Sequence, residues 1–183
     1  MKSFIFIARA GQGAKSAANI LAKSAVLQGL MVQEFPEYGP ERMGAPVKSY
    51  VKIDSKPIRD FSPITNPDFV VLIDKTLIGL ALSLELKGAS IIINDVCSAE
   101  KYYEKYGIKS SVFVIDASKI STETIGLDKP SIPMIGSLLK LDNSVKLESV
   151  NKIIKSFFEK AGKAKVVESN ISAIKKCYEG VNP

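Results

Sequence analysis

A glycine turn near the N-terminus is the local feature with the clearest chemical potential. Gly11, Gln12 and Gly13 separate an apolar run, residues 4–8, from a helical pattern that begins at Ala14. Two glycines at a helix start leave backbone N–H groups unhindered, and such groups bind phosphate with the help of the helix dipole. A ligand-free connection between a closely packed strand and helix would have the same residues. The turn therefore predicts either an anion site or a tight structural connection.

Two standard phosphate-binding motifs match this turn only in part. A dinucleotide fingerprint requires a third small residue, and Ser16 stands where glycine or alanine is usual, although Glu34 lies near the expected position of a ribose-binding acid. A P-loop requires glycine directly before its lysine, whereas Ala14 precedes Lys15. Neither the dinucleotide motif nor the ATPase motif is met.

A second unusual segment, residues 35–46, mixes rigid, aromatic and charged residues. Six of the nine prolines fall between Pro36 and Pro67, which excludes a run of regular helices there. Glu37, Glu41 and Arg42 either pair with one another or present a carboxylate and a guanidinium to a partner or substrate. No acid–base partner is visible for them, so we assign no catalytic residue. Long ordered loops of this kind are usually functional or interfacial.

The composition restricts the chemistry further. The 183-residue chain has no histidine, which removes the commonest general base and the commonest transition-metal ligand. Its two cysteines, Cys97 and Cys177, are too few to hold a four-cysteine iron–sulfur cluster, and we expect them to be reduced thiols. We therefore predict no metal site on this chain, and any chemistry must come from carboxylates, lysines, tyrosines or the cofactor of a partner.

The elements that position these residues alternate along the chain. Strand and helix signals at this spacing predict an α/β fold with a mostly parallel sheet and helices on both faces. After Pro133 the pattern is helical, with apolar stripes that predict a helical C-terminal tail. We expect one domain of residues 1–183. The predicted strands are residues 4–8, 31–35, 47–53, 69–74, 90–94 and 112–116, and the predicted helices before the tail begin near residues 14, 77 and 99.

Charge and hydropathy set the expected surroundings. The net charge is +6, but the lysines are scattered, without a basic block and without interleaved aromatic residues, so nucleic-acid binding is weakly supported. The apolar runs are too short to cross a bilayer, and the N-terminus has no signal-peptide pattern. We expect a cytoplasmic protein that binds neither nucleic acid nor membrane.

The two N-terminal motifs together resemble a known family. Residues 8–14, the alanine-rich helical pattern after them and residues 35–47 are similar to the gamma subunit of pyruvate:ferredoxin oxidoreductase (pyruvate synthase) and its 2-oxoacid relatives. The resemblance continues through residues 66–68, Asp74, Asn94 and residues 132–136, and it reaches Asn170 and residues 178–180. Met43 departs from the arginine or threonine expected at its position.

The resemblance implies a part in the coenzyme A-dependent oxidative decarboxylation of pyruvate or a related 2-oxoacid to acyl-CoA and CO2, with electrons passing to ferredoxin. Thiamine diphosphate, Mg and iron–sulfur clusters are then expected on other subunits, and none on this chain alone. The implied partners are alpha, beta and ferredoxin-like delta subunits in a hetero-oligomer. The isolated chain is accordingly expected to be inactive.

The family resemblance also assigns roles to individual residues. We expect anion or coenzyme A contact at Arg9, Gly11, Gln12 and Gly13. We expect the interface or active-site edge at Glu37, Tyr38, Gly39, Pro40, Glu41 and Arg42. Two alternatives stay open: a self-contained dinucleotide-binding reductase that uses the glycine turn and Glu34, and a pure scaffold subunit. The sequence does not choose among pyruvate, 2-oxoglutarate and branched-chain substrates.

Overall fold

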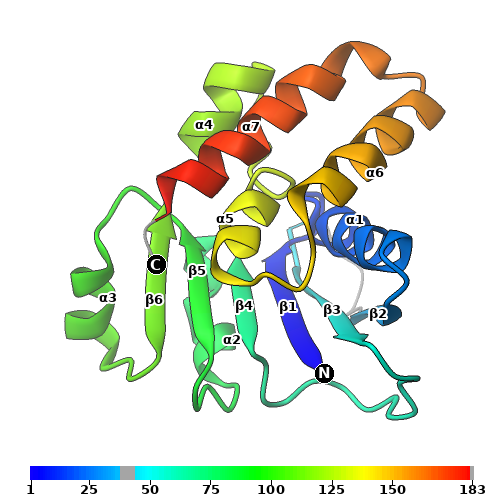
Figure 1. The fold of residues 1–183 in the computed structure, drawn as a ribbon. Coiled ribbons are helices and arrows are strands. Elements are labelled where there is room, and N and C mark those ends of the chain that lie inside the picture. The colour runs from blue at the N-terminus through cyan, green and yellow to red at the C-terminus, as the bar shows by residue number, and fades with distance from the viewer. Residues whose placement is uncertain (38–43, 182–183) are drawn as a thin grey trace.

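The computed structural model, which describes residues 1–37 and 44–181, is built around one six-stranded sheet (Figure 1). Its strands lie in the order β2-β3-β1-β4-β5-β6. Strands β1, β4, β5 and β6 are parallel neighbours, whereas β3 runs antiparallel to both β1 and β2. The predicted mostly parallel sheet is confirmed. The strand bounds are Lys2–Arg9 (β1), Met31–Glu37 (β2), Pro46–Asp54 (β3), Phe69–Leu72 (β4), Ser90–Asn94 (β5) and Ser111–Ile115 (β6).

The central strands are apolar on both sides because helices cover both faces of the sheet. Residues 4–8 of β1 and the whole of β4 are buried, which explains why these strands read as continuous apolar runs rather than alternating ones. Side chains from one sheet face form a core with Phe4 and Phe6, and those from the other face form a core with Ile5 and Ile7.

Helix α1 (Ala14–Leu27) packs against the first of these faces together with α5 (Met134–Leu141). Three further helices extend this layer (Figure 1): α6 (Leu147–Lys160) packs on α1, α7 (Val167–Gly180) packs on α5, and α4 (Ala117–Ile125) packs on α7. The short 3-10 helix η2 (Ala164–Val166) links α6 to α7. The opposite face is covered by η1 (Lys75–Leu77), α2 (Ile78–Leu82) and α3 (Ala99–Tyr106).

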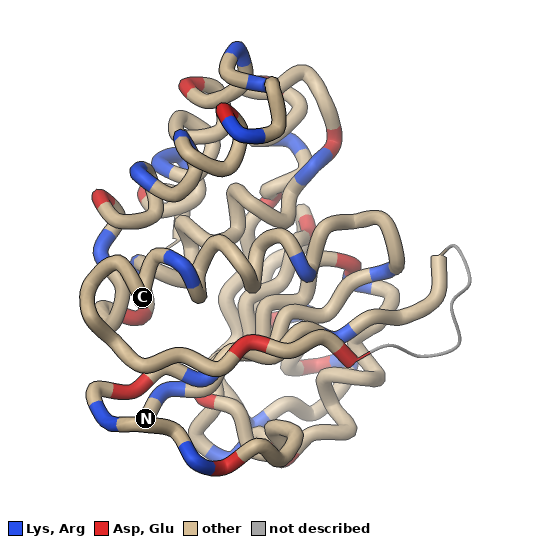
Figure 2. Tube along the Cα trace, turned by 90° about the vertical axis from the view of Figure 1, so that its right-hand side faces the viewer, with Lys and Arg blue, Asp and Glu red and all other residues tan. Residues whose placement is uncertain are grey.

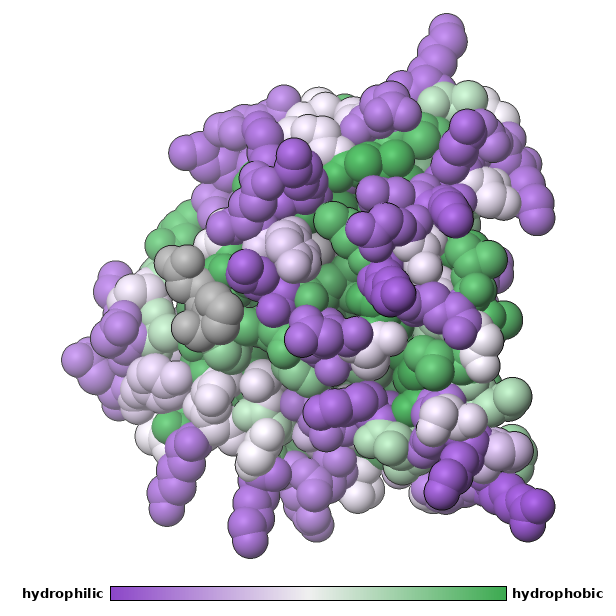
Figure 3. Space-filling view, in the orientation of Figure 1, coloured by the Kyte–Doolittle hydropathy of each residue, from purple (hydrophilic) through white to green (hydrophobic). Residues whose placement is uncertain are grey.

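The helical C-terminal region is an integral layer rather than a peripheral addition. Gly136 of α5 lets α7 approach so closely that a Cβ at this position would lie 1.9 Å from the carbonyl oxygen of Ile174. Ser137 Oγ adds a buried hydrogen bond of 3.0 Å to the Cys177 carbonyl oxygen. The outer helices present hydrophilic side chains to solvent, with apolar patches between them (Figure 3). No helix among residues 1–37 and 44–181 is long and apolar enough to cross a membrane.

Candidate functional site

The glycine turn lies where the sheet changes its winding direction. Strand β1 leads into α1 on one face of the sheet, and its parallel neighbour β4 leads into η1 and α2 on the other face. The two connections diverge at the carboxyl ends of β1 and β4, and open α/β sheets bind their ligands at such a point. Residues 9–13 and 73–76 therefore flank the position where this fold places a ligand.

The turn itself has the predicted geometry. Gly11 and Gly13 both have φ of +92°, a left-handed conformation that favours glycine, and Gly13 is the N-cap residue of α1. The turn follows the first strand and opens the first helix, as predicted. Among the residues that the structure describes, no side chain caps the N-terminus of α1. The first backbone N–H groups of the helix have no intrahelical acceptor and are therefore suited to an anion.

The side chains of Arg9 and Gln12 hold the turn in place. Gln12 Oε1 accepts a hydrogen bond of 2.7 Å from the Arg9 backbone N–H, and Gln12 Nε2 donates one of 2.9 Å to Asp74 Oδ2. Arg9 Nε lies 3.2 Å from the same Asp74 oxygen, and its Nη2 donates to Thr76 Oγ1 at 2.8 Å. Both side chains are thus hydrogen-bonded to other residues of this chain. The groups suited to bind an anion here are the backbone N–H groups of the turn.

Asp74 is a charged member of this network. Burial opposes its ionisation, but hydrogen bonds from Thr76 and Gln12 more than offset that effect, so the pKa of Asp74 lies below its ordinary value. The ionised carboxylate balances the Arg9 guanidinium. Asp74 also caps η1 by accepting from the Thr76 backbone N–H, so one side chain joins the glycine turn to the connection after β4.

The second sequence motif is tied to the same turn. The Ala10 backbone N–H donates to the Ala45 carbonyl at 2.8 Å, and Arg9 Nη1 donates to the Gly44 carbonyl at 3.1 Å. At the other end of this loop, the Glu37 carboxylate accepts a hydrogen bond from Tyr50 Oη and lies 3.7 Å from Lys48 Nζ. Burial and the bond to Glu37 raise the pKa of Tyr50. The remaining expected interface residues, Tyr38, Gly39, Pro40, Glu41 and Arg42, lie outside the described residues.

Ser131 is a neighbour of the turn that the sequence did not indicate. A Cβ on Gly13 would lie 2.5 Å from Ser131 Oγ, so the connection between α4 and α5 passes directly against the N-terminus of α1. Ser131 is itself buried. Glycine is thus favoured at position 13 for two reasons: the left-handed backbone conformation and the close approach of Ser131.

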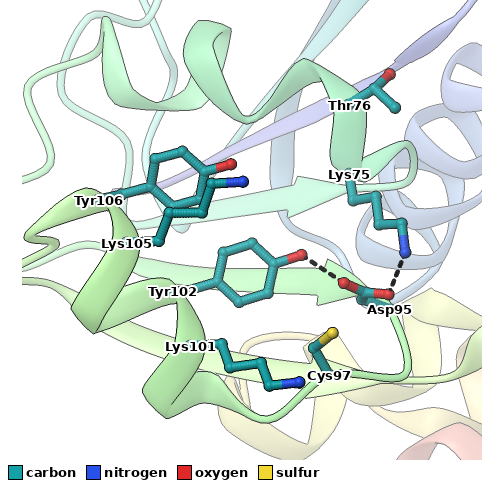
Figure 4. Close-up of a pocket in the computed structure, with 8 residues that line it drawn as sticks. All are labelled: Lys75, Thr76, Asp95, Cys97, Lys101, Tyr102, Lys105 and Tyr106. Carbon is teal, nitrogen blue, oxygen red and sulfur yellow. Dashed lines mark hydrogen bonds and ion pairs between the residues drawn. The ribbon is translucent and has the colours of Figure 1, made fainter.

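A cleft of about 430 Å³ adjoins the site on the α3 side (Figure 4). Thr76, which binds Arg9, also lines this cleft. Figure 4 shows Lys75 and Tyr102 pointing toward Asp95, whose carboxylate lies 2.5 Å from Lys75 Nζ and accepts a 2.8 Å hydrogen bond from Tyr102 Oη. The other lining residues are Cys97, Lys101, Lys105 and Tyr106. The sequence marked these lysines only as part of a scattered positive surface.

The buried Asp95 shifts the pKa values of the two residues that bind it, Lys75 and Tyr102. Burial opposes its ionisation, but hydrogen bonds from Lys75 and Tyr102 outweigh burial, so the pKa of Asp95 lies below its ordinary value. The bond to Asp95 raises the pKa of Lys75, and burial followed by that carboxylate raises the pKa of Tyr102. At neutral pH, Lys75 and Asp95 form an ion pair, and Lys101 and Lys105 give the cleft a net positive charge.

The structure argues against a self-contained dinucleotide reductase. In that motif, the strand with the ribose-binding acid lies directly beside the first strand. Here β3 lies between β1 and β2, so Glu34 on β2 is one strand too far from the glycine turn. The order of the strands therefore removes the geometry that the dinucleotide interpretation needs.

The described residues hold no group of three or more His, Cys, Asp or Glu side chains placed to bind a metal. Cys97 and Cys177 are not bonded to each other. Burial raises the pKa of the Cys177 thiol to about 12, so that this cysteine is neutral at physiological pH. In the view of Figure 2, lysine and arginine are interspersed with aspartate and glutamate along the trace.

Comparison with known proteins identifies the family. The family model "Pyruvate ferredoxin/flavodoxin oxidoreductase" matches residues 3–180. The chain is 40% identical over 174 residues to pyruvate synthase subunit PorC of Thermotoga maritima, covering 94% of this chain and 91% of the relative. It is 39% identical to the pyruvate/ketoisovalerate oxidoreductases common subunit gamma of Pyrococcus furiosus, covering 95% of this chain and 94% of the relative.

A solved structure agrees with both relatives. The crystal structure of pyruvate oxidoreductase subunit PORC from Thermotoga maritima superposes with a TM-score of 0.85 at 34% sequence identity, covering 99% of this chain and 97% of the other. The resemblance seen in the glycine turn and in residues 35–47 thus extends over the whole fold. The chain belongs to the pyruvate ferredoxin/flavodoxin oxidoreductase family, and its similarity to the gamma subunits of that family is confirmed.

Proposed function

We propose that this gamma-type subunit supplies part of the coenzyme A site of a 2-oxoacid:ferredoxin oxidoreductase of the pyruvate type. The companions in that complex would be alpha, beta and ferredoxin-like delta subunits, with ferredoxin as electron acceptor. The observation that carries the proposal is the uncapped N-terminus of α1 at the divergence of β1 and β4. The complex performs the oxidative decarboxylation, and this chain binds and orients the coenzyme.

The anion contact is assigned to the backbone of the glycine turn. Arg9 and Gln12 are bonded to Asp74, so their role is to hold Gly11 and Gly13 in the left-handed conformation that exposes the N–H groups. A phosphate at this position would lie at the positive end of the α1 dipole. Ser131 Oγ beside Gly13 is a further donor at the same place.

The cleft beside α3 supports the same assignment. Coenzyme A carries several phosphate charges, and Lys101 and Lys105 supply positive charge that is not balanced within the cleft. Thr76 connects the cleft to the Arg9 network, so a long anionic molecule would pass from the lysines to the turn without leaving the surface. Charge of this kind raises the local concentration of an anionic ligand.

The sequence has neither a Gly-Asp-Gly segment of the thiamine diphosphate type nor the ligands of an iron–sulfur cluster. A cluster requires four thiolate ligands, and the chain has two cysteines, of which Cys177 is buried and neutral. The redox and decarboxylation steps are therefore assigned to companion subunits. Residues 37–42 are proposed to lie at the edge where those subunits meet this chain, because Glu37 binds Tyr50 and Lys48 of β3, and Gly44 and Ala45 after this segment are bonded to the glycine turn.

The test is hydrogen exchange in the assembled complex with and without coenzyme A. The N–H groups of Ala14 and Ser16 lack intrahelical acceptors and should exchange quickly in the ligand-free complex. Coenzyme A should slow their exchange, whereas pantetheine, which has no phosphate, should not. Unchanged exchange of residues 13–16 with saturating coenzyme A would leave the scaffold interpretation as the correct one.

A further inference from the structure

The connection between β3 and β4, residues 55–68, lies at the opposite end of the strands from the glycine turn. Ile53 pairs with Lys2 at the amino end of β1, so the connection begins at that end. In its middle stands Phe61, whose side chain is 78% exposed and belongs to neither core cluster. Phe61 is the most exposed of the large hydrophobic residues that the structure describes, and an exposed aromatic ring on a rigid support is suited to anchor a partner protein.

This loop is held in a fixed shape by a buried lysine. The Lys52 side chain is only 3% exposed and extends from β3 to Asp60 and Ser62, the residues on both sides of Phe61. Its Nζ donates to the carbonyl and carboxylate oxygens of Asp60, both at 2.9 Å, and to the Ser62 carbonyl at 2.8 Å. All three ammonium donors are thus used by the loop.

Burial of this charge has a cost that only a defined loop conformation offsets. A buried ammonium is unfavourable unless it is fully hydrogen-bonded and paired, and here every partner belongs to the loop. Asp60 Oδ1 also accepts from the backbone N–H and hydroxyl of Ser62, at 2.9 and 2.6 Å. Pro57 and Pro63 restrict the flanking backbone further. Such a loop presents Phe61 with little conformational entropy to lose on docking.

The charge around Phe61 indicates the chemistry of its partner. Lys56 and Arg59 are exposed, and among the described residues neither forms an ion pair. Hydrogen bonds from Ser62 and the Lys52 ammonium lower the pKa of Asp60, whose charge is taken up by Lys52. The surface beside the ring is therefore basic. Two copies of the chain meeting here would place like charges together, which disfavours self-association.

We propose that Phe61 anchors this chain to a companion subunit, by entering an apolar pocket whose rim carries carboxylates facing Lys56 and Arg59. Aromatic residues on rigid supports dominate interface energetics, and neighbouring charges select the partner. The inference rests on membership of a multi-subunit complex but not on the coenzyme A contact, because the loop lies at the opposite end of the strands. Loss of docking and loss of coenzyme A binding are therefore separately measurable.

The test is competition for incorporation into the complex. Wild-type and Phe61→Ser chains are co-expressed at equal levels with the companion subunits, the complex is purified through a tagged companion, and mass spectrometry gives the ratio of the two chains. Phe61→Ser should be under-represented by about 10- to 100-fold, the range of an interface anchor. Its thermal midpoint as a free chain should be unchanged because the ring is exposed. Equal incorporation overturns the proposal.

Matched variants separate the anchor from general effects. Leu127→Ser removes another apolar side chain, 59% exposed, and should be incorporated like the wild type. Loss as large as that of Phe61→Ser would overturn the specific role of the ring. Arg59→Glu should be excluded by charge repulsion, and normal incorporation would overturn the acidic rim.

Lys52→Met tests the rigid support. Release of the loop should speed trypsin cleavage after Arg59 in the free chain and reduce incorporation by about 3- to 10-fold through the added entropy of docking. Faster cleavage with full incorporation would overturn the rigid presentation. A wild-type chain that forms dimers abolished by Phe61→Ser would assign the anchor to a second copy and overturn the companion assignment.

Discussion

Gly136→Ala should strongly destabilise the fold, although it adds a single methyl group to a helix. The new Cβ would lie 1.9 Å from the Ile174 carbonyl oxygen and 2.9 Å from the Tyr178 backbone nitrogen. Both are backbone atoms of α7, so no side-chain rotation relieves the contact. Ordinary van der Waals contact begins at 3.4 Å, so α5 and α7 must separate by about 1.5 Å.

The magnitude follows from what this separation disrupts. Overpacking a closely packed core typically costs about 1–3 kcal/mol. The separation also breaks the Ser137–Cys177 hydrogen bond, for about 1 kcal/mol more, and opens gaps beside Met134 and Ile135. We expect the free energy of unfolding to fall by about 2–4 kcal/mol, which lowers the thermal midpoint by roughly 4–16 °C in a chain of this size.

The assay is urea and thermal unfolding followed by circular dichroism at 222 nm, since the chain has no tryptophan. The matched control is Gly79→Ala in α2, where an added Cβ meets nothing within 4 Å. That change should stabilise slightly, by about 0.5–1 kcal/mol, because alanine favours a helix over glycine. A loss below about 1 kcal/mol for Gly136→Ala, or equal losses for both variants, would refute the close-approach argument.

Three further outcomes are expected. Native chain should react with Ellman's reagent at pH 8 through the half-buried Cys97 alone, and Cys177, with its thiol pKa of about 12, should react only after unfolding; two fast thiols would contradict this. Asp95→Asn should cost about 1–3 kcal/mol at pH 7. Because the pKa of Asp95 is lowered in the fold, its contribution is fully present above the ordinary value of 3.8 and is lost as pH falls through the lowered folded pKa. The stability gap between wild type and variant should therefore narrow in urea titrations as pH falls below 3.8, and a constant gap would contradict the ion-pair account. Gln12→Ala should lower the free energy of unfolding by about 1–3 kcal/mol through loss of the hydrogen bonds to Arg9 and Asp74. An unchanged urea midpoint would show that these two bonds do not stabilise the turn.

The first strand, the glycine turn and α1 could be predicted because their signals are local. Residues 4–8 form an unbroken apolar run, two glycines end it, and small alanines line the buried side of the following helix. Helix α4 was not predicted, since its sequence is rich in serine, threonine and polar residues that favour helices weakly. Its end signals were nevertheless present: Asp116 caps its first turn, and Gly126 ends it in the left-handed conformation.

The neighbours of the turn could not be predicted because they depend on strand order. Gln12 meets Asp74, 62 residues further along, only because β4 pairs with β1. Ser131 reaches Gly13 through the path of the connection between α4 and α5, on which no local pattern bears. The insertion of β3 between β1 and β2 was equally hidden, since alternation in residues 47–53 indicates a strand but not its place in the sheet.

The clamp between the glycine turn and the loop after β2 has an evolutionary consequence. Arg9 holds Gly44 through the backbone carbonyl, and it holds Thr76 and Asp74 through side chains. Selection therefore acts on the two motifs as one unit. Which residues are accepted at position 44 depends on the backbone conformation there, and which are accepted at positions 74 and 76 depends on the polar side-chain groups that bind Arg9. Among diverging relatives, replacement of Arg9 should be inherited together with changes at positions 74 and 76, whereas position 44 should stay glycine because its φ of +81° favours that residue.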